Sequence, residues 1–238
     1  MPPQKPLKKP LLFAVLALLF SAFSLRAGMP GEDEVCIPVQ PAFTVLSLYS
    51  QLHLDNLGLN FNTYNLAVHG WQKLKATGKL SREVLAICDF TQSSSQKRLY
   101  VIDMLNGKLL FNTLVAHGRN TGEEFAQSFS NQPSSNKSSL GFYCTGETYQ
   151  GGHGLSLKLR GQEPGFNDNA EERAIVMHGA EYVNTGFIEQ NGRLGRSFGC
   201  PAVSVAEHEQ IINAIKGGSC LFIYYPDGKY LASSKLLH

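Results

Sequence analysis

The sequence predicts a mainly β fold with short helices and an N-terminal helical extension. Two stretches with helical periodicity lie between residues 43 and 75, and short β-type runs separated by turn-forming residues follow from residue 84. The 238 residues are 43% hydrophobic and 17% charged, which is typical of a globular domain. This composition excludes collagen-like, disordered and coiled-coil chains.

The first 27 residues have the pattern of a secretory signal. A lysine-rich start precedes an unbroken apolar run from Leu11 to Phe20, and small residues follow it. We expect cleavage after Ser24 or Ala27. An uncleaved membrane anchor is the alternative, but the run is too short for a hydrocarbon core of about 30 Å. Residues 1–27 are therefore expected to be a signal peptide, which leaves no integral membrane segment in the mature chain. The protein is expected to be exported to the periplasm or the cell wall.

Residues 28–83 are expected to form a linker and an N-terminal helical extension. The segment 31–41 is acidic and contains prolines, as linkers often do. Apolar residues at helical spacing predict one helix over residues 43–57 and a second over residues 61–75. Asn60 or Asn62 is expected to cap the second helix, and Gly78 to end it. We assign no chemistry to these two helices.

The rest of the chain, residues 84–238, is expected to form the main domain. An Asn-Gly step at 106–107 lies between two strand-like runs and predicts a β-hairpin. A polar surface loop is expected over residues 121–138, and a short amphipathic helix over residues 205–215. The predicted strands are Val84–Phe90, Arg98–Asp103, Lys108–Val115, Gly141–Gly146, Leu155–Leu159, Ala174–His178 and Ser219–Tyr225.

The charge pattern argues against a nucleic-acid partner. The formal net charge is +2, but four of the 21 basic residues lie in the first 27, where there is no acidic residue. Without them, 17 basic side chains face 19 acidic ones. A nucleic-acid-binding protein normally carries a clustered positive surface, and no basic run remains here to supply one.

Five cysteines bear on the chemistry of an exported chain. An oxidising compartment permits disulfides, and an odd number leaves at least one thiol free or intermolecular. None of the five forms a Cys-x-x-Cys pair or a ligand cluster, so we expect no metal and no cofactor. The pairing cannot be deduced from the sequence. The cysteines are Cys36, Cys88, Cys144, Cys200 and Cys220.

Two segments carry the candidate chemistry. One is a predicted strand that ends in His178 and Gly179, and the other is the glycine-rich turn 195–201, which contains Cys200. A nucleophilic thiol needs a base, and His178 is the candidate. Gly199 allows close approach of the backbone to a carbonyl, and N–H groups in such a turn could stabilise an oxyanion. The helix expected to begin near Ser204 would add positive potential.

Structural roles for these residues stay open at this point. Cys200 could be buried or disulfide-bonded, and His178 could be a hydrogen-bonded structural residue. A metal site built from His178, His153 and Cys200 is weaker, because the spacing matches no common ligand pattern.

The same segments resemble the L,D-transpeptidase (YkuD) catalytic domain family. Its signature is a His-Gly followed by Ser/Thr-His-Gly-Cys, matched here by 178–179 and 197–200. The segments Leu99–Gly118 and 138–143 also look like the opening hairpin and a following strand of that domain. Phe198 replaces a second histidine, and Pro201-Ala202 replace an asparagine or arginine. The pattern Gly-Arg-Ser-x-Gly-Cys-Pro is therefore similar to a divergent branch of the family.

The resemblance, over about residues 85–225, implies a β-sandwich-like catalytic domain at 84–238 and a cysteine enzyme that acts on peptidoglycan stem peptides. Cys200 would attack the carbonyl of an L-centre, expel a terminal D-alanine and form a thioester. An amine from a second stem peptide, or a lysine of an outer-membrane lipoprotein, would resolve it. His178 would move the proton, and the carbonyl of Gly179 would orient the imidazole.

Other residues of the turn are candidates for supporting roles. Ser197 could hydrogen-bond within the turn or to substrate, or merely close the turn, and Gly199 is expected to help to hold the oxyanion. Arg196 is the nearest substitute for the missing arginine, because a guanidinium suits a carboxylate. Arg173 and Arg193 are further candidates for that role.

Two other functions remain open. The same site with water as acceptor would make an L,D-carboxypeptidase or an amidase, and a fold that has lost its chemistry would make a wall-binding module. His117 and His153 could line the cleft or only be solvated. Tyr182 and Phe198 could form an apolar wall or only pack.

Overall fold

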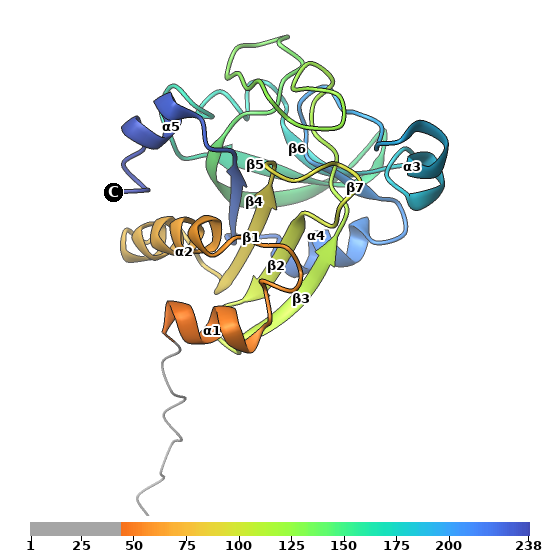
Figure 1. Cartoon of the computed structure of the whole chain (residues 1–238). Coiled ribbons are helices and arrows are strands. Elements are labelled where there is room, and N and C mark those ends of the chain that lie inside the picture. The colour runs from red at the N-terminus through yellow and green to blue at the C-terminus, as the bar shows by residue number, and fades with distance from the viewer. Residues whose placement is uncertain (1–43) are drawn as a thin grey trace, which may run out of the picture. The chain divides into compact units, whose positions relative to one another are not determined.

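The computed structural model describes residues 44–238, so the predicted signal peptide and Cys36 lie outside the described residues. The mainly β expectation is confirmed. Eight strands form one mixed sheet in the order β3-β2-β1-β8-β4-β5-β6-β7. Figure 1 labels all of them except β8. The strands are β1 (Val84–Asp89), β2 (Leu99–Asp103), β3 (Lys108–Thr113), β4 (Gly141–Gly151), β5 (Gly154–Gly161), β6 (Val176–Ala180), β7 (Ala202–Ser204) and β8 (Cys220–Tyr224). The helices are α1 (Val45–Gln51), α2 (Phe61–Ala76), α3 (Thr185–Asn191), α4 (His208–Ile215) and α5 (Gly228–Ser233).

The sheet curls until its two edges nearly meet. β2 and β3 form the predicted antiparallel hairpin, β1 pairs in parallel with β8, and β4 links β8 to β5. At the far edge β6 pairs in parallel with β7. The chain beyond β3 then bridges back to β7 through Ala116 and Ala202. A single bridge thus links the short edge strand β7 to the chain that follows β3.

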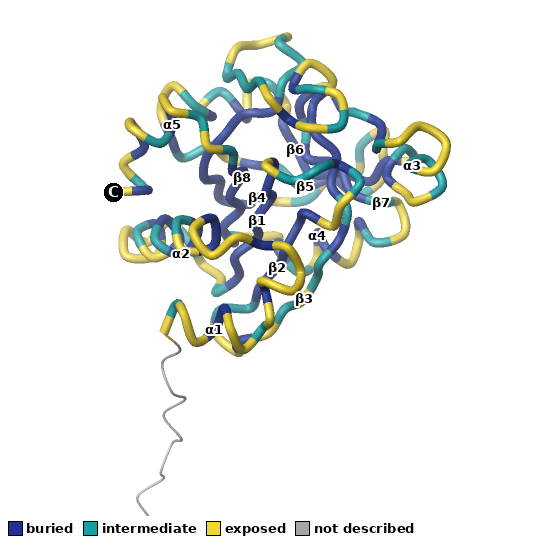
Figure 2. The backbone as a smooth tube through the Cα atoms, viewed as in Figure 1, coloured by how far each residue is buried: buried dark blue, intermediate teal, exposed yellow. Residues whose placement is uncertain are grey.

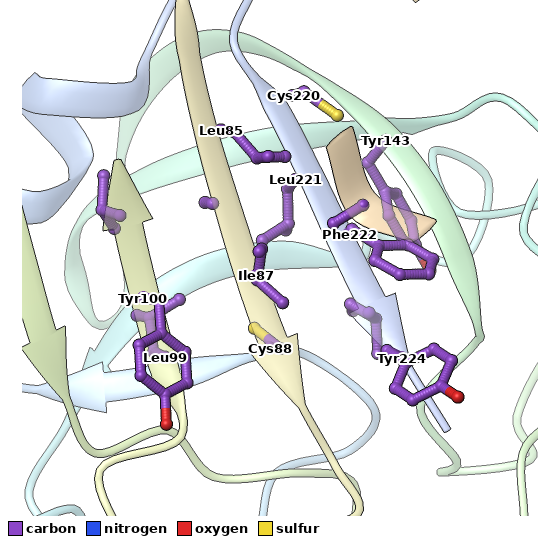
Figure 3. Close-up of a cluster of buried hydrophobic side chains, with 14 of the residues drawn as sticks. Leu85, Ile87, Cys88, Leu99, Tyr100, Tyr143, Cys220, Leu221, Phe222 and Tyr224 are labelled. Carbon is purple, nitrogen blue, oxygen red and sulfur yellow. The ribbon is translucent and has the colours of Figure 1, made fainter. Parts of the chain in front are cut away.

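The main core joins the centre of the sheet to the N-terminal helices and to α4. β1 and β8 are buried along their full length (Figure 2), as expected for parallel neighbours covered on both faces. Figure 3 shows the side chains of this centre, Leu85 and Leu221 among them. α2 approaches closely at Gly70, where an added Cβ would lie 2.1 Å from the Phe142 ring. Phe142 in turn stacks on Phe222 with ring centroids 4.1 Å apart.

A buried carboxylate joins the C-terminal helix to the sheet. Glu163 is only 4% exposed and accepts hydrogen bonds from the Phe142 amide at 2.8 Å and the Tyr230 hydroxyl at 2.9 Å. The Ser234 hydroxyl donates to its other oxygen. Burial raises the pKa of Glu163, and these donors oppose that rise.

The predicted strands are all present, but two expectations about helices are wrong. The first helix ends at Gln51, and α4 begins at His208, so the three-residue strand β7 separates Cys200 from the helix. The expected contribution of a helix N-terminus to the thiol is therefore absent from this arrangement. β7, α3 and α5 were not predicted, because each is short and has weak periodicity.

The described cysteines are free thiols. Cys88, Cys144 and Cys220 are buried in strands, and Cys200 is partly exposed. Cys144 and Cys220 are direct partners across β4 and β8 without a disulfide between them. Between residues 44 and 238 no helix is long and apolar enough to cross a membrane.

Candidate active site

Strand pairing brings the predicted nucleophile and base together. His178 lies in β6 opposite Ala202 of β7, two residues after Cys200. Both side chains line one cavity of about 340 Å³, which opens to solvent. Its walls include Cys200, His178, His153, Arg173, Arg196 and Tyr182.

The thiol of Cys200 rests against the backbone that leads into β6. Its Sγ accepts from the Val176 amide at 3.5 Å and donates weakly to the Ala174 carbonyl at 3.7 Å. Burial raises the pKa of Cys200, while the Val176 amide and the Arg173 cation lower it. Because burial dominates, the resting form at neutral pH is the thiol, and attack requires a base.

A backbone carbonyl orients His178. Its Nδ1 lies 3.0 Å from the Gly179 oxygen, and since a carbonyl only accepts, Nδ1 carries the proton. Nε2 is then the nitrogen with a free lone pair. Burial lowers the pKa of His178, the Gly179 bond raises it, and His153 and His208 lower it. The ring is therefore uncharged near neutral pH, as a general base must be.

His153 is a site residue that the sequence left undecided. It lies in the turn between β4 and β5, and its ring stacks on His178 with centroids 4.7 Å apart and planes 26° apart. In the sequence, only the glycines beside His153 indicate an unusual turn. No motif spacing predicts that this turn lies next to β6. His208 of α4 packs beneath Gly179, where an added Cβ would lie 2.8 Å from its ring. A side chain at that position would therefore displace the His208 ring.

Ser197 closes the nucleophile turn. Its hydroxyl donates to the Cys200 carbonyl at 2.6 Å and accepts from the Gly199 amide at 3.1 Å. Gly199 has φ of 127°, a conformation that favours glycine, and its carbonyl accepts from Ser138 at 3.1 Å. The Gly199 N–H is thus taken within the turn. This N–H could stabilise an oxyanion only if its hydrogen bond to the Ser197 hydroxyl were broken. The oxyanion role of Gly199 stays a prediction.

The two arginines that line the cavity, Arg196 and Arg173, have different hydrogen-bond partners. Arg196 donates to Glu123 at 2.6 Å and to the carbonyls of Arg119 and Gly122. To bind a substrate carboxylate, Arg196 would have to release the carboxylate of Glu123. This role of Arg196 stays a prediction.

Arg173 holds the 130–139 loop against the site. It donates to the carbonyls of Ser130 at 2.9 Å and Lys137 at 2.7 Å. Its charge also favours the thiolate form of Cys200. Ala174, the next residue, has φ of 52°. A non-glycine residue in this left-handed region costs about 1 kcal/mol or more.

The other residues that the sequence singled out have mixed outcomes. His117 is buried outside the cavity, where its Nδ1 lies 2.8 Å from Arg98 and burial lowers its pKa to about 4. Tyr182 and Phe198 do line the cavity, and Phe198 is 67% exposed under the guanidinium of Arg119. Residues 44–238 contain no group of three potential metal ligands.

Comparison with known proteins gives a family match. A sequence model of the L,D-transpeptidase catalytic domain matches residues 55–224. No curated protein matches the chain significantly. Among solved structures, an L,D-transpeptidase from Mycobacterium smegmatis is 12% identical, with 60% of this chain and 59% of that chain covered and a TM-score of 0.37.

Two further structures have similar values. An L,D-transpeptidase from Mycobacterium tuberculosis is 15% identical, with 60% and 58% covered and a TM-score of 0.36. The helical cell shape determining protein Pgp2 from Campylobacter jejuni is 14% identical, with 65% and 55% covered and a TM-score of 0.38. The chain thus spans less than two thirds of each of these proteins. Because these structural similarities are low, the match over residues 55–224 is the stronger finding.

Proposed function

This chain belongs to the L,D-transpeptidase catalytic domain family, and we propose that it is a cysteine-dependent murein L,D-transpeptidase acting on peptidoglycan stem peptides. The observation that carries the proposal is the shared cavity of Cys200 and His178, in which the imidazole is held by the Gly179 carbonyl. A thiol, an uncharged base and a group that orients the base are the parts that acyl transfer through a thioester needs.

The first half of the reaction uses this resting arrangement. Nε2 of His178 takes the thiol proton as Sγ attacks the carbonyl carbon of the donor peptide. The tetrahedral intermediate collapses, the terminal D-amino acid leaves with the proton from His178, and a thioester remains on Cys200. Because both groups rest uncharged, no ion pair has to be desolvated when substrate enters.

Substitution of the nucleophile tests this proposal. Cys200→Ser and Cys200→Ala should abolish turnover, because an oxygen nucleophile beside this imidazole is poor and alanine has none. The melting temperature should change little, since Sγ makes only two long polar contacts. Intact mass after incubation with a carbapenem should show an acyl adduct on the parent alone. Turnover by either variant would reassign the nucleophile, and a large loss of melting temperature in Cys200→Ala would support a structural cysteine.

The acceptor separates transfer from hydrolysis. We propose an amine acceptor from a second stem peptide or an outer-membrane lipoprotein, which makes a cross-link or an anchor. A muropeptide digest after expression should contain new 3→3 dimers, in which the carbonyl of the donor L-centre is bonded to the acceptor amine. Tripeptides without such dimers would instead identify an L,D-carboxypeptidase.

We further propose that the enzyme works outside the cytoplasm, after removal of residues 1–27. The support is the lysine-rich start and the apolar run Leu11–Phe20. N-terminal sequencing of protein from the cell envelope should find a start near Ala27. Intact Met1 in an integral membrane fraction would contradict this.

A further inference from the structure

Two of the free thiols lie opposite each other in the centre of the sheet. Cys144 of β4 and Cys220 of β8 are direct partners in the antiparallel register of these strands, and the two residues are 8% and 0% exposed. Figure 3 shows Cys220 among the buried side chains around β8. Neither thiol lines the cavity that contains Cys200, so the proposed reaction leaves both unused.

Hydrogen bonds beside this pair define its geometry. The Thr145 amide donates to the Ser219 carbonyl at 3.0 Å, so these two residues continue the register as a hydrogen-bonded pair. The two kinds of pair alternate along an antiparallel ladder, which makes Cys144 and Cys220 a non-hydrogen-bonded pair. The Cα atoms of such a pair are about 4.5 Å apart. This spacing falls within the range of about 4.4 to 6.8 Å in which a disulfide can close.

The neighbouring pair on the same face agrees with this spacing. Phe142 of β4 and Phe222 of β8 are also direct partners, and their rings stack with centroids 4.1 Å apart. Side chains at every second position share a face of the sheet, so the two sulfurs lie beside this stack. The Cys144 thiol donates one weak hydrogen bond, to the Lys79 carbonyl at 3.4 Å. A disulfide would replace only that contact.

We propose that Cys144 and Cys220 are a site of oxidative modification, at which a disulfide forms once the chain is in an oxidising compartment. The inference rests on the proposed export and adds a covalent link to the fold. β8 and β4 are the seam between the strands β3, β2, β1 and β8 and the strands β4 to β7, which include His178. The seam has four residue pairs, and the two cysteines form the last of them. A disulfide here fixes the half of the sheet that carries the base to the half that packs on α2.

The oxidant is a disulfide of a protein or a small molecule. Cys144 reacts first, because it is the less buried thiol and the cations of Lys79 and Arg160 oppose the rise of its pKa on burial. Its sulfur bonds to one sulfur of the oxidant, and the other sulfur leaves as a thiolate. The Cys220 thiolate then attacks Sγ of Cys144 and displaces the second thiolate. The two protons lost by the cysteines pass to these thiolates, so the oxidant is reduced to two thiols.

This pairing bears on the thiol that the proposed reaction needs free. Among residues 44–238 it leaves Cys200 and Cys88, and Cys88 is fully buried in β1. Within that part of the chain, Cys200 then has no accessible cysteine with which to pair, and its thiol stays available for acylation.

Mass spectrometry of the full chain tests the assignment. The purified protein is incubated with oxidised glutathione, alkylated with iodoacetamide and digested with trypsin without reduction. The four described cysteines fall on the separate tryptic peptides 83–97, 138–158, 197–216 and 217–229. Peptides 138–158 and 217–229 should be recovered joined by a disulfide, whereas peptide 197–216 should carry glutathione or the alkyl group. Recovery of 138–158 and 217–229 mainly as separate peptides would overturn the inference.

Thermal unfolding gives a second readout. Because the disulfide closes the loop of residues 144–220, the oxidised parent should melt about 5 °C or more above the parent kept under a reductant. Cys144→Ala should abolish this difference. Cys88→Ala, at another buried strand cysteine, is the matched control and should keep it. Each variant is compared with itself under the two conditions, which removes the cost of the substitution. An equal difference in both variants would overturn the assignment, and the peptide analysis of the parent needs neither variant to fold.

The outcomes separate this inference from the function itself. Acylation of Cys200 by a carbapenem is measured on the parent kept under reductant, where it does not depend on the disulfide. An acyl adduct together with unlinked peptides would refute the disulfide and leave the proposed function standing. Linked peptides without an acyl adduct would support the disulfide and contradict the proposed function.

Discussion

Replacing His153 tests how the base is kept uncharged. The His153 ring stacks on His178, so a protonated His153 opposes protonation of its neighbour, and it is one of the groups that lower the pKa of His178. Two unit charges at the centroid distance of 4.7 Å repel each other by about 0.9 kcal/mol even at the dielectric constant of water. That energy corresponds to a factor of about four in the protonation equilibrium.

The sign of the effect is set by this repulsion. Without His153, the pKa of His178 rises, so the base is lost at a higher pH as the solution is acidified. His153→Ala should therefore shift the acid limb of kcat/KM to higher pH, with activity on that limb about fourfold below the parent. His153→Phe keeps a stacked ring without a charge and should shift the limb in the same direction. His208, Arg173 and Arg196 remain in both variants, so the difference reports His153 alone.

The assay is a pH profile of kcat/KM for donor acylation, together with an NMR titration of the His178 ring. His69→Ala, on α2 and outside the cavity, is the control and should leave both unchanged. An acid limb that stays in place, or moves to lower pH in His153→Ala, would refute the electrostatic argument. Loss of kcat at every pH in His153→Ala with full activity in His153→Phe would show that stacking matters and charge does not.

Two further predictions concern Arg196 and the buried Glu163. Arg196→Lys should lower kcat/KM about tenfold or more, because an ammonium cannot reproduce the guanidinium fork. Glu123→Gln should lower KM, because it removes the carboxylate that competes with substrate for Arg196. Unchanged kinetics in both variants would mean that Arg196 only stabilises the loop. Glu163→Ala should cost about 2–4 kcal/mol in urea unfolding, because it leaves the Phe142 amide and the Tyr230 hydroxyl unpaired and opens a cavity. Glu163→Gln, which keeps one acceptor oxygen, should cost less than half as much, and equal costs would argue against the hydrogen bonds.

The strand pattern and the candidate nucleophile and base could be predicted from local sequence. Alternating and apolar runs specify strands through the period-two geometry of the pleat, and the Asn-Gly step specifies the hairpin that joins β2 and β3. Cys200 lies in a glycine-rich turn and His178 directly precedes a glycine. Both features can be recognised from the adjacent residues alone. The family match over residues 55–224 agrees with the resemblance seen in those motifs.

The neighbours of the nucleophile and base depend on pairings between distant segments, which local patterns do not encode. β7 has only three residues and pairs with β6, which is distant in sequence. Because three residues show no period, the sequence pattern predicts the start of a helix there instead of a strand. His153 reaches His178 only because β5 pairs with β6 at Ser156 and His178. Arg196 meets Glu123 across 73 residues of sequence. Local sequence therefore determined most of the elements and the candidate nucleophile and base, whereas sheet register, a property of the whole tertiary structure, decided what surrounds them.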